Sequence, residues 1–180
     1  MGSLLLTLLV ASCQTSRLNP LEYAHWVNNP SNGLQVAVEG VNGKHFLAYQ
    51  PPAYQAILAQ KPKDWNDPAF RAQLSEGASL QIYTLYLPPS KSLQAKSSAF
   101  DASTNRFWMV DGKDTLECVH LHPINDLKNS TTLLLGFPRL TETDQQAKTL
   151  LIQDMANPAD PLEMHLSAAA LQAHANLLNI

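Results

Sequence analysis

The sequence of 180 residues has few charged side chains, only two cysteines and no long hydrophobic run. Charged residues make up 15% of the chain, the net charge is −3, and the lysines and arginines are scattered singly. A chain without a basic stripe cannot neutralise a row of phosphates, which argues against nucleic acid as a partner. No apolar stretch approaches the roughly 20 residues of a transmembrane helix.

Motifs of the common enzyme classes are also missing. The sequence contains no Gly-x-Ser-x-Gly, Walker or Rossmann fingerprint. Paired carboxylates occur at Asp111 with Asp114 and at Glu142 with Asp144. Their surroundings predict a turn and a solvated loop, respectively. We therefore expect a protein that is not an enzyme and needs no cofactor.

Apolar residues, at 45% of the chain, are sufficient for a hydrophobic core. Asn, Gln, Ser and Thr take the place of the missing charges, which favours an uncharged polar surface over disorder. The length after the N-terminal segment suits one domain, which we place at residues 20–180.

The N-terminal segment has the pattern of a targeting signal. Leu4 to Val10 form an apolar run of the length found in secretory signals, and the small residues Ala11 and Ser12 follow it. With Cys13, this pattern resembles the lipobox of bacterial lipoproteins. The resemblance implies that residues 1–12 are a signal peptide, that Cys13 is lipidated and begins the mature chain, and that residues 13–19 are a tether. Three acyl chains exceed the two signals needed for stable anchoring.

Later segments extend this resemblance. Tyr23–Leu34, Gln50–Pro52, Asp114–His120 and Leu134–Phe137 resemble small uncharacterised envelope lipoproteins of Bacteroidetes-type bacteria. The resemblance implies a lipid-anchored envelope protein without an assigned activity. Because no catalytic motif is present, we expect it to act through contact with an unidentified envelope protein partner. Because Gln rather than Asp follows Cys13, the resemblance also implies an outer-membrane location facing the periplasm.

Strand signals dominate the rest of the chain. Leu34–Gly40 and Lys44–Gln50 flank Asn-Gly, and Asn105–Val110 and Thr115–His122 flank Asp-Gly, so each pair predicts a β-hairpin. Further strands are expected at Ser79–Leu87, Thr131–Phe137, Lys148–Asp154 and Leu162–Leu166.

Four helices are expected among these strands. The first begins at Pro20 behind the cap Asn19, and the last begins after Ser167. Two more are expected at 53–60 and 68–76. The sum predicts an α+β fold, mainly an antiparallel β-sheet or small sandwich of hairpins, with short helices packed on one face or end.

The densest group of metal-ligand side chains is Cys118, His120 and His122, which share one face of the predicted strand 115–122. An adjacent pair could bind a metal with help from His45, His165 or Asp114. The competing interpretation places Val119 and Leu121 in the core and both histidines on a solvated face. An alternative function is therefore a periplasmic small-ligand or metal-binding module. With Cys13 lipidated, Cys118 has no disulfide partner, and we expect it to be buried.

Nine aromatic side chains could line a binding groove or fill the core. Their alternation along the strands puts Phe107 and Trp108, and likewise Tyr83 and Tyr86, on opposite faces. The full set is Tyr23, Trp26, Tyr49, Tyr54, Trp65, Tyr83, Tyr86, Phe107 and Trp108.

Overall fold

A computed structural model describes residues 18–40, 43–62, 64–75, 79–88, 106–125, 131–153 and 161–177. The signal segment 1–12, Cys13 and most of the tether 13–19 lie outside the described residues.

The larger sheet has five strands, and every neighbouring pair is antiparallel. In spatial order the strands are β1 (Gln35–Gly40), β2 (Gly43–Gln50), β3 (Leu80–Leu87), β7 (Thr131–Pro138) and β6 (His120–Asn125). The hairpin predicted around Asn-Gly is confirmed, because β1 pairs with β2 and Gly40 lies opposite Gly43.

The second sheet has four strands and is also antiparallel throughout. Its spatial order is β5 (Asp114–Glu117), β4 (Phe107–Asp111), β8 (Lys148–Ile152) and β9 (Leu162–Leu166). The hairpin predicted around Asp-Gly is formed by β4 and β5, with Gly112 at a positive φ of 64° in the turn. Glycine adopts this left-handed conformation without steric cost.

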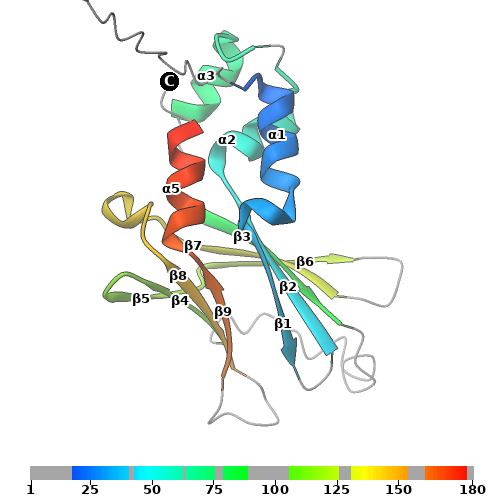
Figure 1. Cartoon of the computed structure of the whole chain (residues 1–180), viewed down its shortest axis with the longest axis vertical. Helices are drawn as coiled ribbons and strands as arrows, with labels where there is room; N and C mark the ends of the chain where they lie inside the picture. Colours follow the sequence, from blue (N-terminus) through cyan, green and yellow to red (C-terminus); the bar gives the residue numbers. More distant parts are fainter. Residues whose placement is uncertain are drawn as a thin grey trace, which may run out of the picture.

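The helices gather at one end of the two sheets (Figure 1). They are α1 (Pro20–Asn28), α2 (Pro52–Gln60), α3 (Pro68–Ser75) and α5 (Ala168–Leu177), with short 3-10 turns η1 (Pro30–Asn32) and η3 (Thr141–Thr143). Asn19 caps α1 as predicted: its side chain accepts from the Glu22 N–H, and the Glu22 carboxylate accepts from the Asn19 N–H. The predicted α+β class is confirmed.

The core lies between the inner faces of the two sheets. Leu47, Tyr83 and Leu135 of the larger sheet and Leu150 and Met164 of the smaller one are fully buried. Burying a side chain of this size contributes about 1.5–3 kcal/mol. Among the described residues, no helix is both long and apolar enough to cross a membrane.

The prediction of one strand over Thr115–His122 is wrong. The chain leaves the smaller sheet after Glu117 and enters the larger one at His120, so the alternating pattern covers two strands in different sheets. The second of these, β6, contains Pro123 and, among the described strands, pairs with β7 alone. Proline lacks an N–H for a ladder bond and is therefore tolerated on such an edge strand.

Candidate interaction surface

Cys118 lies in the bend between β5 and β6, where it is 3% exposed. Its thiol donates to the His120 carbonyl oxygen at 3.1 Å. Burial raises the pKa of this thiol, which disfavours the reactive thiolate. The prediction that Cys118 is buried is confirmed, and its surroundings suit a packing role.

His120 and His122 lie on β6 and are exposed, so they do not share a strand with Cys118. The shared face that motivated the metal hypothesis is therefore absent. The expected helpers are not gathered around them: His165 contacts Thr149 and Glu163 on the other sheet. Within the described part of the chain, no group of three or more His, Cys, Asp or Glu side chains could hold a metal ion.

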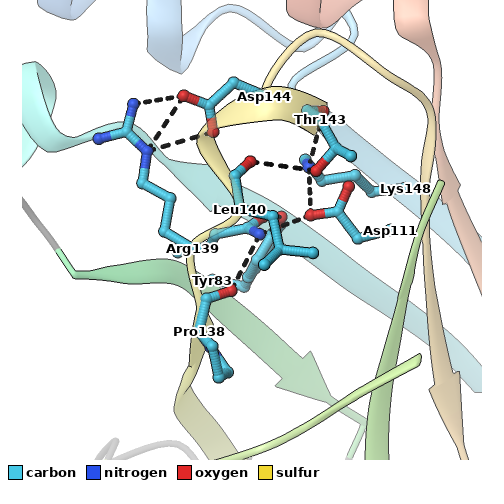
Figure 2. A network of polar contacts seen from close by, with 9 residues as sticks. Tyr83, Asp111, Pro138, Arg139, Leu140, Thr143, Asp144 and Lys148 are labelled. Carbon is cyan, nitrogen blue, oxygen red and sulfur yellow. Dashed lines mark hydrogen bonds and ion pairs between the residues drawn. The ribbon is translucent and has the colours of Figure 1, made fainter. Parts of the chain in front are cut away.

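The strongest polar cluster is a buried ion pair inside the smaller sheet (Figure 2). Asp111 and Lys148 are cross-strand neighbours on β4 and β8, and their side chains are 0% and 1% exposed. Lys148 Nζ donates to Asp111 Oδ2 at 2.6 Å and to the Thr143 carbonyl at 3.1 Å. Such a pair is stable only when further hydrogen bonds compensate its desolvation.

Two side chains of β3 provide those bonds from the other sheet. Gln81 Nε2 donates to Asp111 Oδ2 at 2.7 Å and to the Pro138 carbonyl at 3.2 Å. The Tyr83 hydroxyl donates to Gln81 Oε1 at 2.9 Å. Burial raises the pKa of Tyr83, so its hydroxyl remains a donor. The network therefore joins the two sheets across the core.

A partly buried ion pair lies beside this network. Arg139 Nε donates to both carboxylate oxygens of Asp144 at 3.1 Å, and both side chains are 28% exposed. The hydrogen bonds to Asp144 raise the pKa of Arg139. Figure 2 shows this pair beside Thr143, whose carbonyl oxygen accepts a hydrogen bond from Lys148.

A histidine and three aromatic rings link the helices to the core. His174 of α5 lies 2.6 Å from the Tyr23 hydroxyl of α1, and its ring also packs near Trp26 and Tyr49. Burial lowers the pKa of His174 to about 4 and raises that of Tyr49 to about 12. A neutral imidazole can accept a hydrogen bond from the Tyr23 hydroxyl, so this contact is a neutral hydrogen bond at pH 7.

The buried network was missed by the sequence reasoning, which assigned Asp111 to a turn. Strand parity is the signal that could have found it, because Asp111 continues the inward series of Phe107 and Met109. Lys148 likewise precedes the inward Leu150. Asp111 Oδ1 is buried without a described hydrogen-bond partner, whereas Oδ2 accepts two hydrogen bonds. The network fits a structural role, which holds the two sheets together, better than it fits a catalytic one.

The outer face of the five-stranded sheet is the most distinctive surface. Apart from Glu39 and Lys44 at one rim, the strand register places on it a set of side chains without any Asp, Glu, Lys or Arg, which we call the uncharged face. Its members are Gln35, Ala37, Phe46, Ala48, Gln50, Ile82, Thr84, Tyr86, His120, His122, Ile124, Thr132, Leu134 and Gly136.

Contacts across the strands confirm that these side chains share one face. Phe46 and Tyr86 are register partners whose rings meet edge to face, 5.9 Å apart. A Cβ placed on Gly136 would lie 2.9 Å from His120 Cβ and 3.3 Å from Ile82 Cδ1. Phe46 and Ile124 are each 44% exposed, so two large apolar side chains of this face are open to solvent.

Charge returns only at one rim of the uncharged face. Glu39 and Lys44 are register partners there, and Lys44 Nζ lies 5.5 Å from the centre of the Phe46 ring. This pair has opposite charges, so the rim adds no net charge to the face.

The outer face of the four-stranded sheet differs in charge. Its rows are Glu117, Trp108, Leu151 and Glu163, then Thr115, Val110, Thr149 and His165, and we call it the acidic-edged face. A glutamate thus occupies each edge strand, and Glu163 Oε2 lies 3.4 Å from His165 Nε2. Its apolar members, Trp108, Val110 and Leu151, are only partly exposed.

No protein-family model and no curated protein sequence matches the chain. A crystal structure of a protein of unknown function from Burkholderia pseudomallei is similar over 92% of this chain and 98% of that chain. The two chains are 14% identical, with a TM-score of 0.45. Similarity at this level assigns neither a family nor an activity.

Proposed function

We propose that the protein is a lipid-anchored envelope protein that acts without catalysis, as an interaction module. The observation that supports this function is the uncharged face, a sheet surface whose charged side chains are confined to Glu39 and Lys44 at one rim. Contiguous exposed apolar surface marks interaction sites on protein domains. The expected anchor is Cys13, which follows Leu4–Ser12, and the expected location is the outer membrane facing the periplasm.

The geometry favours contact over chemistry at this face. Its polar members are amides, hydroxyls and two histidines, and the Asp111–Lys148 pair lies on the opposite, inner side of the sheets. A nucleophile, a base and an orienting group within reach of one another are the minimum for most hydrolytic sites. A surface of mixed apolar and uncharged polar groups is instead typical of the centre of a protein interface, where charged residues are depleted.

The anchor is tested by processing and fractionation. Globomycin, which blocks the lipoprotein signal peptidase, should cause the unprocessed precursor to accumulate, and Cys13→Ser should release the protein from the membrane fraction. Cys118→Ser is the matched control, because it removes the buried cysteine and should leave fractionation unchanged. Membrane association that is unaffected by both globomycin and Cys13→Ser would exclude the lipid anchor.

The interaction role is tested by placing a charge on the uncharged face. Phe46→Glu should abolish contacts with envelope proteins that chemical crosslinking detects in intact cells, because the glutamate would be desolvated in the contact. Leu58→Glu is the matched control, since Leu58 is 55% exposed on α2, away from the uncharged face. Equal crosslinking in both variants would contradict an interaction role for this face.

A further inference from the structure

We infer that the partner of the uncharged face is a second copy of this chain, which stacks its own uncharged face on the first around a two-fold axis. The inference rests on the proposed function, because it names the partner of the same surface. Two copies related by a two-fold axis present the same patch to one another, so that patch must be complementary to itself.

Charge is the first argument for a second copy. A face with charges of one sign would repel an identical face, whereas the uncharged face meets its copy without like-charge contacts. Its rim pair, Glu39 and Lys44, has no net charge and can be paired within each copy. The acidic-edged face fails this requirement, because Glu117 and Glu163 would bring four carboxylates into one interface.

Area is the second argument. Five strands have four spacings of about 4.8 Å, which together span roughly 19 Å, and six residues along a strand span roughly 20 Å. The face therefore covers about 400 Å² in projection, and the relief of its side chains raises the accessible area further. Stable interfaces bury about 600–1,000 Å² on each partner, so a dimer requires the whole face together with its rim.

Edge pairing between two copies is disfavoured, which leaves the face. The strand β6 is an edge of the five-stranded sheet, and its Pro123 cannot donate a ladder hydrogen bond to a further strand. At the opposite edge, β1 lies against β9 of the other sheet. Face-to-face stacking needs no backbone donors, and it sets two sheets about 10 Å apart with their side chains interdigitated.

The apolar residues of the face are placed for such stacking. Phe46 and Ile124 lie in one cross-strand row, near opposite edges of the sheet, with Tyr86 between them. The next cross-strand row contains Leu134 with the small side chains Ala48 and Thr84. A large row beside a smaller one allows each copy to fit its bulky side chains against the smaller side chains of the other.

The test is the mass of the full chain carrying Cys13→Ser, measured by light scattering after size exclusion at about 100 μM. The expected mass is twice the 19.8 kDa of one chain. Phe46→Glu and Ile124→Glu, both at exposed positions, should weaken the dimer at least 100-fold and elute as folded monomers by circular dichroism. Leu58→Glu and Leu21→Glu, at exposed apolar positions of the helices, should remain dimeric.

Three results would overturn the inference. A monomeric parent chain at this concentration excludes a stable dimer. Dimers that persist in both face variants, or that are lost in the two helix variants, place the contact elsewhere. If the protein is monomeric and binds neutral or anionic phospholipid vesicles, and Phe46→Glu abolishes this binding, the partner of the face is a membrane surface. If the parent chain is monomeric while Phe46→Glu still abolishes envelope crosslinks, the interaction role survives and only the second copy is excluded.

Discussion

The outer faces of the two sheets have the same alternating construction, yet one has a glutamate on each edge strand and the other has charge only in the Glu39–Lys44 pair at one rim. On the acidic-edged face, Glu117 and Glu163 occupy the two edge strands, and its apolar residues are only partly exposed. On the uncharged face, Phe46 and Ile124 are exposed and no charged residue separates them. Charged side chains on edge strands disfavour association. Under the proposed function, one sheet face is adapted to water and the other to a partner.

The core differs from the uncharged face as well, because it contains a charged pair between the two sheets. Asp111 and Lys148 form a fully buried pair that Gln81 connects to the larger sheet. Placing a charge pair in the core costs desolvation energy unless each group is well bonded. We interpret this pair as a device that fixes how the two sheets meet, so that the uncharged face keeps one shape.

The largest expected effect comes from breaking the interior pair. Lys148→Met should destabilise the protein by about 3–5 kcal/mol, because it leaves the Asp111 carboxylate buried and unpaired. Urea unfolding measures the loss, and Lys113→Met, at the exposed neighbouring turn, should change stability by less than about 0.5 kcal/mol. The double variant Asp111→Leu with Lys148→Met should recover much of the loss. A loss below about 1 kcal/mol in Lys148→Met would show that the pair does not hold the sheets.

Acidification should produce the next largest effect, at the helical end. The folded pKa of His174, about 4, lies below its unfolded value of about 6.5, so the unfolded chain binds more protons between these values. The contribution of His174 to the free energy of unfolding is about 3 kcal/mol. It is fully present above pH 6.5 and is lost as the pH falls toward 4. Urea unfolding across this range should show the loss, and His174→Gln should flatten it. A His174 titration midpoint near 6.5 by NMR would contradict the burial argument.

A smaller effect is expected from adding one methyl group to the uncharged face. Gly136→Ala would place a Cβ 2.9 Å from His120 Cβ, which is fixed to the backbone and cannot rotate away. We expect a destabilisation of about 1–3 kcal/mol by overpacking, although alanine normally suits a strand better than glycine. The same substitution made in a His120→Gly background should cost less than about 0.5 kcal/mol. Equal costs in the two backgrounds would show that His120 does not pack over Gly136.

The smallest effect concerns salt. A dimer formed by the uncharged face should change its dissociation constant less than about threefold between 0.05 M and 0.5 M NaCl, because it brings no uncompensated charges together. Analytical ultracentrifugation measures this dependence. A dimer held by the acidic-edged face would strengthen markedly with salt as the repulsion between glutamates is screened, and such a dependence would reverse the comparison between the two faces.

Strand alternation and turn residues were sufficient to predict the α+β class, both hairpins and the four helices. They failed at Thr115–His122, because alternation continues unbroken through the bend at Cys118 although the chain changes sheets there. The uncharged face could be inferred only in part. The low charge content was visible, but which residues share a face depends on register between strands that lie far apart in sequence, such as Tyr86 and Thr132.

The buried pair was hidden for a related reason. Asp111 precedes a glycine at a turn, where aspartate is common, and Lys148 begins a strand, where lysine is normally exposed. Only the pairing of β4 with β8 brings them opposite one another. Long-range register, which local patterns do not encode, therefore decides both the interior pair and the outer face.

The most direct test of the account is photo-crosslinking in living cells from matched positions on the two outer faces. Ala37 on the uncharged face and Thr115 on the acidic-edged face are both exposed strand residues, and each can be replaced by a photoreactive amino acid. The account predicts a crosslinked product of twice the chain mass from position 37 and none from position 115. No product from position 37, or equal products from both positions, would contradict it.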